Sequence, residues 1–204
     1  MSKIAVDVVL LPSEEMMDKA IQTNDELVQK FGSEIVLSKD NCLPHISLAM
    51  GCIDERDIPY IEKVLKLIAG EKPLGRLIIS NIRTSTNSRG EIVSVFEIDK
   101  TKELQSLHEK VMKEVQPFFI YNVAEDMIYN AEVAESTLLW IKNYPEKASF
   151  ENFLPHITIG YGLIENGSFP IEFAVSRLAL CHLGNHCTCR KILASIDLRK
   201  DDGR

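Results

Sequence analysis

Hydrophobic residues recur along the chain with two different spacings, and each spacing predicts one kind of secondary structure. Apolar residues spaced three or four apart predict amphipathic helices that begin after Ser13, Asp57 and Thr101, which are residue types suited to capping a helix. Apolar or alternating runs rich in Val and Ile predict strands. The helices are expected over residues 13–31, 57–70 and 101–116, and the strands over 4–10, 34–37, 77–83, 92–98, 133–141, 171–183 and 187–198.

A pattern of nine residues occurs twice and carries the clearest chemical information in the chain. The copies read LPHISLAMG at residues 43–51 and LPHITIGYG at residues 154–162. Proline favours an extended conformation for the residue before it, and the β-branched Ile and its apolar neighbours favour a strand. We therefore expect His45 and His156 at the starts of two strands.

Each copy places a histidine and a hydroxyl on one face of its strand. Residues two apart along a strand point to the same side, so His45 accompanies Ser47 and His156 accompanies Thr158. The Ile and Leu residues between them face the opposite side, into packing. Because a purely structural strand would carry apolar residues at these positions, the polar faces are expected to look into a shared cleft.

These two motifs resemble the pair that defines the 2H phosphoesterase superfamily, which includes 2′-5′ RNA ligase-like proteins and RNA 2′,3′-cyclic phosphodiesterases. The family pattern H-x-[ST]-x reads HISL at residues 45–48 and HITI at residues 156–159. The resemblance implies an α+β, bilobal, duplicated fold in which two mainly antiparallel sheets face a central cleft and helices lie outside. Residues 1–204 would form a single domain of two pseudo-repeated lobes, with a boundary near residues 75–100.

The resemblance also implies metal-independent chemistry at 2′-linked phosphodiesters. His45 and His156 would be the catalytic acid and base, in an order that the sequence leaves open, because histidine changes its charge near neutral pH. Ser47 and Thr158 would bind the phosphate. The expected reaction is hydrolysis of 2′,3′-cyclic phosphate ends of RNA or nucleotides, without a metal or other cofactor. A 2′-5′ oligonucleotide phosphodiesterase or ligase is the alternative within the family.

The composition of the chain limits the kinds of binding partner that we expect. With 204 residues, 45% apolar and 26% charged, the chain is expected to form one soluble globular unit. A net charge of −7 argues against broad binding to duplex nucleic acid, which leaves RNA ends, short oligonucleotides or small cyclic nucleotides. Asp7 interrupts the apolar run at residues 4–11, so this run is too polar for a signal peptide or a membrane span. The odd count of five Cys favours a reducing compartment, and we expect a cytoplasmic monomer with no membrane contact.

A segment rich in cysteine and histidine suggests a different class of function. Cys181, His182, His186, Cys187 and Cys189 surround Gly184-Asn185, a pair that favours a tight hairpin. Such a hairpin could gather zinc ligands and make a zinc-stabilised binding module. A structural zinc site usually takes ligands from two places, so small buried thiols in a strand are the competing interpretation.

Four further residues have two interpretations each. His108 lies on the apolar face of its helix and is expected to be a hydrogen-bonded core residue rather than a catalytic one. Trp140 could stack on a base, but the surrounding apolar run favours the core. Arg83 and Arg89, near the polar tip between residues 77–83 and 92–98, either contact a phosphate at the cleft mouth or belong to a solvated loop.

Overall fold

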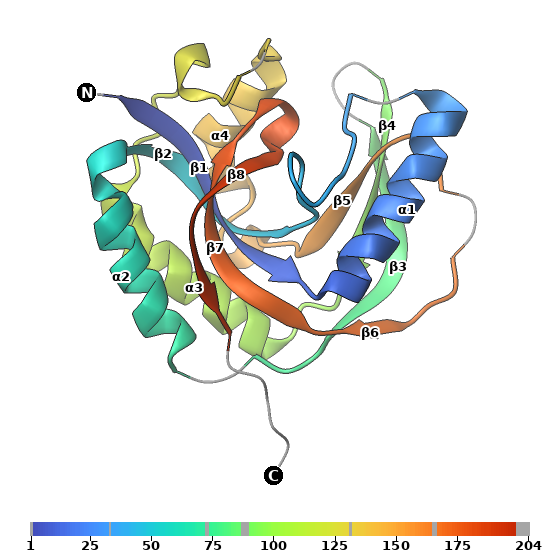
Figure 1. Cartoon of the computed structure of the whole chain (residues 1–204), viewed down its shortest axis with the longest axis horizontal. Helices are drawn as coiled ribbons and strands as arrows, with labels where there is room; N and C mark the ends of the chain where they lie inside the picture. Colours follow the sequence, from blue (N-terminus) through green and yellow to red (C-terminus); the bar gives the residue numbers. More distant parts are fainter. Residues whose placement is uncertain are drawn as a thin grey trace.

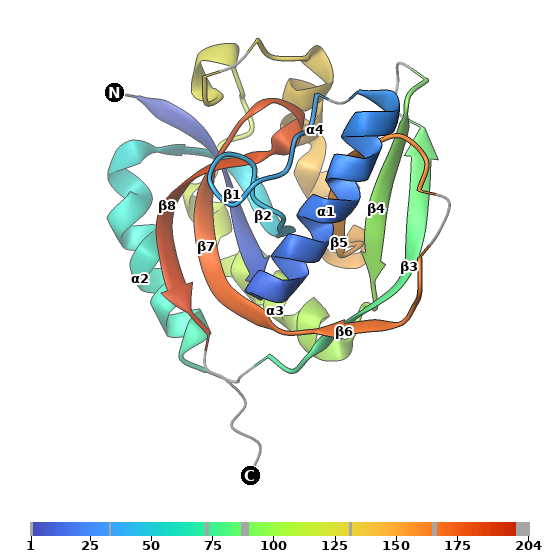
Figure 2. The ribbon, with the colours of Figure 1, turned by 45° about the vertical axis from the view of Figure 1, so that its right-hand side comes forward.

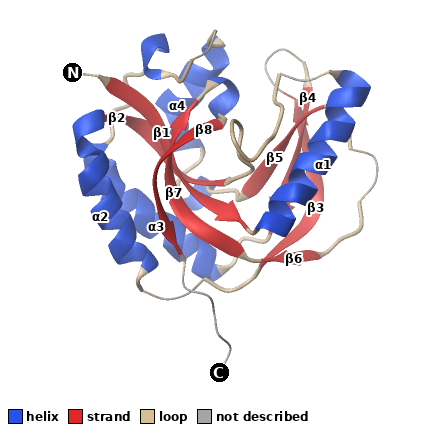
Figure 3. Ribbon diagram, in the orientation of Figure 1, coloured by secondary structure: helices blue, strands red, loops and turns tan. Residues whose placement is uncertain are grey.

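The chain folds into two antiparallel sheets with helices packed against them. The computed structural model describes residues 2–32, 34–71, 74–86, 90–130, 132–164 and 167–198. Within these ranges one four-stranded sheet has the order β2-β1-β7-β8 and the other has the order β5-β4-β3-β6. Helices α2 and α3 lie outside the first sheet and α1 lies outside the second, as Figures 1 and 3 show. The predicted α+β fold with two lobes is confirmed.

The first sheet is organised around β1, which is buried at every position after Lys3. Strands β2 and β7 flank β1, and β8 pairs with β7. This placement accounts for the run of Val and Leu in β1, because a strand covered on both faces has little need of polar residues. The strands are β1 (Lys3–Pro12), β2 (Ile46–Asp54), β7 (Val175–Leu183) and β8 (Cys189–Asp197).

The second sheet contains the predicted hairpin of two consecutive strands. Strand β4 pairs with β3 on one side and with β5 on the other, and the short β6 closes the far edge beside β3. Helix α1 packs against β5. The strands are β3 (Leu77–Thr86), β4 (Ile92–Ile98), β5 (His156–Tyr161) and β6 (Ile171–Phe173).

Three of the four α-helices found in the described ranges begin where the sequence predicts. Thr101 Oγ1 accepts a hydrogen bond from the backbone N–H of Leu104, whereas Ser13 and Asp57 precede their helices without a side-chain capping bond. The α-helices are α1 (Glu14–Phe31), α2 (Ile58–Ala69), α3 (Lys102–Val115) and α4 (Glu135–Lys147). Single 3-10 turns are η1 (Glu55–Asp57), η2 (Gln116–Phe118), η3 (Glu125–Met127), η4 (Phe150–Asn152) and η5 (Asn185–Cys187).

Two predicted strands are wrong. Residues 133–141 were expected to form a strand, but helix α4 begins at Glu135 and buries one side chain per turn, namely Thr137, Ile141 and Tyr144. Residues 34–37 form no strand either, because Asn24 of α1 takes up their backbone groups. The Asn24 amide donates to Ile35 O at 2.9 Å, and its oxygen accepts from Leu37 N at 2.8 Å.

The predicted strand over residues 171–183 is divided between the two sheets. Only Ala174 separates β6 from β7, so the chain passes directly from the second sheet into the first along the lower edge of Figure 2. The first sheet consequently combines strands from both ends of the chain. A single boundary near residues 75–100 does not describe which strands share a sheet, and the duplication of the lobes stays a prediction.

Candidate active site

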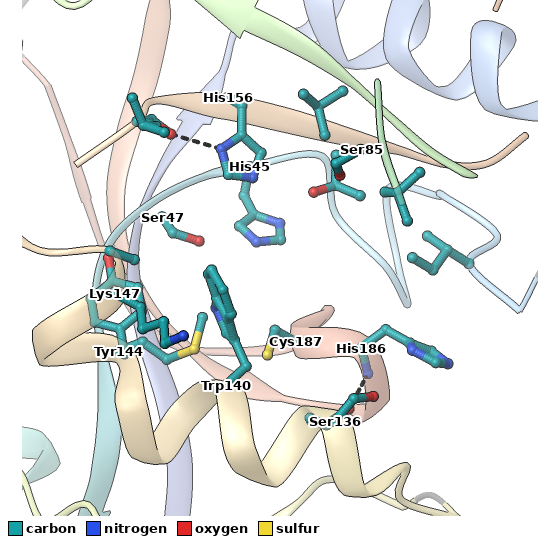
Figure 4. Close-up of a pocket in the computed structure, with 18 of the residues that line it drawn as sticks. His45, Ser47, Ser85, Ser136, Trp140, Tyr144, Lys147, His156, His186 and Cys187 are labelled. Carbon is teal, nitrogen blue, oxygen red and sulfur yellow. Dashed lines mark hydrogen bonds between the residues drawn. The ribbon is translucent and has the colours of Figure 1, made fainter. Parts of the chain in front are cut away.

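The two motif copies meet at one cavity between the sheets. His45 lies just before β2 in the first sheet, and His156 begins β5 in the second. Both histidines, together with Ser47 and Thr158, line a cavity of about 380 Å³. Figure 4 shows His45, Ser47 and His156 pointing into the same space. The structure therefore brings all four predicted site residues together from two separate sheets.

Both imidazole rings are held by the same local contact. His45 Nδ1 lies 2.8 Å from Leu43 O, and His156 Nδ1 lies 2.7 Å from Leu154 O. Because a carbonyl oxygen can only accept, Nδ1 carries the hydrogen in each ring. The other nitrogen, Nε2, is then the atom of each ring that can take up or release a proton.

Burial favours the neutral form of both histidines. It lowers the pKa of His45 to about 4, against a raising contribution from the Leu43 carbonyl. Burial also lowers the pKa of His156, again opposed by its backbone contact, and the nearby Arg83 guanidinium adds to the lowering. A neutral Nε2 is a proton acceptor, so either ring can serve as a base.

Asp7 lies directly behind the first motif. Its carboxyl group is fully buried on β1, and Asp7 Oδ2 lies 2.6 Å from Ser47 Oγ and 4.0 Å from His45 Nε2. Burial raises the pKa of Asp7 to about 8, against the hydrogen bond with Ser47. From the sequence alone, Asp7 is no more than a break in an apolar run. A charged residue inside an otherwise buried strand was the feature that could have marked it.

Helix α4 supplies side chains to the cavity that the sequence did not predict. Trp140 and Lys147 line it from the side opposite the histidines (Figure 4). Trp140 is 42% exposed, so the prediction that it belongs to the core is wrong. The faulty strand prediction hides this position, because on helix α4 Trp140 lies at the edge of the buried face, three residues after Thr137 and four before Tyr144.

A cationic side chain of the second sheet also reaches the cavity. Arg83 on β3 lines the wall, and its Nε lies 3.4 Å from a carboxylate oxygen of Glu97 on β4. Of the two interpretations of Arg83, this position favours a contact with a ligand over a purely solvated loop. Arg89 lies outside the described residues.

The predicted zinc segment forms a different structure. A 3-10 turn, η5, separates β7 from β8 in place of a two-residue turn, and Cys181 and Cys189 are buried in the core. His186 enters the cavity wall instead. There its Nε2 lies 2.7 Å from Glu34 Oε2, and its Nδ1 lies 3.0 Å from Tyr161 Oη. Across the described ranges, no group of three or more His, Cys, Asp or Glu residues is arranged to hold a metal ion.

His108 is a core residue, as predicted. It is fully buried, its Nδ1 donates to Leu48 O at 2.8 Å, and its Nε2 accepts from Phe150 N at 2.7 Å. Its ring stacks on Phe153 with centroids 4.0 Å apart. His108 thereby ties the strand after His45 to the segment before His156.

Comparisons with known proteins identify the fold. No protein-family model and no curated protein sequence matches this chain. Among solved structures, TT0787 of Thermus thermophilus aligns over 96% of this chain and 98% of that one, with 15% identity and a TM-score of 0.59. E. coli LigT in complex with ATP aligns over 98% and 100%, with 14% identity and a TM-score of 0.53. The apo form of LigT gives 14% identity and a TM-score of 0.51.

The fold and the cavity together define a class of protein. It is a two-lobed α+β protein with one histidine from each sheet facing a common cavity. More particularly, the chain has the fold of TT0787 and of E. coli LigT over nearly its whole length, which is consistent with the resemblance of its motifs to the 2H phosphoesterase superfamily. Within the described residues, no helix is long and apolar enough to cross a membrane.

Proposed function

We propose that this protein is a metal-independent 2H phosphoesterase that hydrolyses 2′,3′-cyclic phosphate ends of RNA or nucleotides. The observation that carries the proposal is the convergence of His45 and His156 from separate sheets on one cavity. Each ring directs Nε2 away from the carbonyl that holds Nδ1. Two such groups can take up and deliver a proton at one phosphorus centre.

The two histidines divide the proton transfers of hydrolysis. One neutral Nε2 accepts a proton from water as the water oxygen forms a bond to phosphorus. The other ring, as imidazolium, gives its Nε2 proton to the departing ribose oxygen as the bond from that oxygen to phosphorus breaks, so the product is a monoester with a free hydroxyl. The hydroxyls of Ser47 and Thr158 donate to the non-bridging oxygens, where negative charge builds up.

The remaining cavity residues suit a nucleotide. Arg83 and Lys147 place positive charge at the wall of a protein whose net charge is −7, and Trp140 offers an aromatic face. Base stacking on such a face contributes about 1–3 kcal/mol. LigT, which shares the fold, has been crystallised with ATP. We therefore assign RNA ends, short oligonucleotides or small cyclic nucleotides as the substrate class.

Two assignments within the family remain to be separated by experiment. A 2′-5′ oligonucleotide phosphodiesterase or ligase would use the same pair of histidines, because each of these reactions takes a proton from an attacking oxygen and gives one to a leaving oxygen at phosphorus. Hydrolysis of the cyclic phosphate is our first choice, since it needs only water beside the four motif residues.

A substrate panel in the presence of EDTA tests the proposal. The panel contains a 2′,3′-cyclic nucleotide, a 3′,5′-cyclic nucleotide and a 2′-5′-linked dinucleotide, and the products are separated by chromatography. We expect EDTA-resistant opening of the 2′,3′-cyclic nucleotide and a loss of at least about 10²-fold in turnover in His156→Ala. His182→Ala is the matched control, because His182 lies outside the residues that line the cavity. Preference for another substrate, or loss of activity with EDTA, would overturn the proposal.

A further inference from the structure

The first motif has a buried carboxyl group behind it that the proposed chemistry does not use. Asp7 is absent from the cavity wall and is fully buried, yet one hydrogen bond joins it to Ser47, which lines the cavity. Its second oxygen, Oδ1, is buried without a hydrogen bond of normal geometry among the described residues. The Ser47 hydroxyl and the Ala49 backbone N–H both stabilise the ionised form of Asp7, but the cost of burying its charge outweighs them and raises the pKa.

The groups around Asp7 come from every neighbouring element. On β1 it lies opposite Met50 of β2 and Cys181 of β7 in the strand register. Tyr144 of α4, Cys187 of η5 and Cys189 of β8 are close enough for the Asp7 charge to raise their pKa values, although burial is the larger cause for each. His45, with Nε2 at 4.0 Å, is the neighbouring base. Apart from His45, the titratable groups facing Asp7 are thus thiols and a phenol.

The protonation state of Asp7 decides what Ser47 can do. A serine hydroxyl has one hydrogen to donate. When Asp7 is ionised, the Ser47 hydroxyl donates that hydrogen to Oδ2 and turns a lone pair toward the cavity. When Asp7 is protonated, the carboxyl group donates to Ser47 Oγ, and the hydroxyl hydrogen of Ser47 is available to an anion in the cavity.

We infer that Asp7 is a positioning residue, which in its protonated form directs the hydroxyl hydrogen of Ser47 toward the substrate phosphate and in its ionised form withdraws it. Ionisation also places a negative charge directly behind Ser47. The repulsion between this charge and the phosphate weakens binding further. The effect of Asp7 on catalysis rests on the proposed function. Anion binding in the cavity depends on the same Ser47 hydroxyl hydrogen, and it can be measured without turnover.

The pH range of the effect follows from the burial of Asp7. Burial raises the pKa of Asp7 to about 8, so the protonated fraction falls about tenfold between pH 7 and pH 9. Burial raises the pKa values of Tyr144, Cys187 and Cys189 and lowers that of His45 to about 4, which keeps these neighbours from titrating in this range.

The test compares kcat/KM of the native protein and of Asp7→Asn for a 2′,3′-cyclic nucleotide from pH 6 to pH 9. An asparagine amide donates to Ser47 Oγ as a protonated carboxyl does, but it cannot ionise. The titration of His156 is common to both proteins, and burial holds the pKa of His45 near 4, so between pH 7 and pH 9 the ratio of native to variant isolates Asp7. We expect this ratio to fall about tenfold between pH 7 and pH 9. A ratio that is constant with pH, or that rises, would overturn the inference.

Two controls separate this role from a general structural one. Asp25 is exposed on α1, and Asp25→Asn should keep the native pH profile. Thr158, whose strand neighbour on β4 is Val95, provides the second hydroxyl of the cavity. Thr158→Ala should lower kcat/KM at every pH and still show the additional alkaline loss of the native protein. If Thr158→Ala lacked that loss, its origin would not be the pair of Asp7 and Ser47.

Sulfate binding distinguishes failure of the inference from failure of the proposed function. Sulfate does not titrate between pH 7 and pH 9, and its affinity can be measured by calorimetry. We expect the affinity ratio of native protein to Asp7→Asn to fall about tenfold over this range, whether or not the cyclic nucleotide is hydrolysed. If hydrolysis fails and this ratio falls, the proposed function is wrong and the inference stands. If hydrolysis succeeds and both ratios stay flat, the inference alone is wrong.

Discussion

At the scale of single residues, the sequence predicts that the four motif side chains share a cavity, but neither the other residues that line it nor the burial that shifts the pKa values of the histidines. The spacing of two residues in each motif correctly pairs His45 with Ser47 and His156 with Thr158. The position of Asp7 could not be predicted, because it depends on how β1 and β2 align. An irregularity in that pairing, where Val8 lies opposite Ala49 and Val9 opposite Ser47, sets which side chains of β2 lie beside Asp7.

Asp7 should make the protein less stable as the pH rises. Burial raises its pKa from 3.8 to about 8, so its stabilising contribution is complete below pH 3.8 and is lost as the pH rises toward 8. The free energy of unfolding of the native protein should fall, relative to Asp7→Asn, by about 1.4 kcal/mol per pH unit within this window. Urea unfolding at pH 5, 6, 7 and 8 measures the difference.

The exposed Asp25→Asn provides the baseline for that series. A stability difference between native protein and Asp7→Asn that does not change with pH would mean that Asp7 is ionised in the folded protein throughout. Such a result would contradict the account of the buried carboxyl.

At the scale of secondary structure elements, long amphipathic helices and the hairpin of β3 and β4 are predictable, and α4 is not. The run at residues 133–141 contains so many apolar residues that its helical period is hidden, and Leu139 and Trp140 are in fact exposed. The segment at residues 34–37 was missed for another reason. Its backbone groups bind Asn24, and the same amide also donates to Ile159 O of β5 at 2.7 Å. A contact between such distant residues leaves no trace in a local pattern.

Helix α4 should contribute to substrate binding through Trp140. Loss of a stacking surface typically costs about 1–3 kcal/mol per base, so Trp140→Ala should raise KM for a 2′,3′-cyclic nucleotide about tenfold and leave kcat nearly unchanged. The neighbouring Leu139 is 48% exposed on the same helix but does not line the cavity, so Leu139→Ala is the matched control. Equal KM values for the two variants in steady-state kinetics would remove Trp140 from the binding site.

At the scale of the whole molecule, the arrangement of strands follows from long-range pairing that no local pattern specifies. The first sheet joins β1 and β2 to β7 and β8 from the other end of the chain. The two motifs consequently lie in different sheets, and His45 and His156 approach one cavity from both. The resemblance of the motifs predicted the bilobal fold, and the likeness to TT0787 and LigT bears this out. The sequence did not predict that strands from both ends of the chain share one sheet.

The central claim is that His45 and His156 act together on one phosphate, and a double-mutant cycle tests it most directly. The kcat for a 2′,3′-cyclic nucleotide is measured for the native protein, His45→Ala, His156→Ala and the double variant, with circular dichroism to verify each fold. We expect kcat to fall at least about 10²-fold in each single variant. In the double variant, kcat should be no more than about tenfold below that of the less active single variant. Losses that multiply in the double variant, or a single variant with near-native turnover, would contradict the claim.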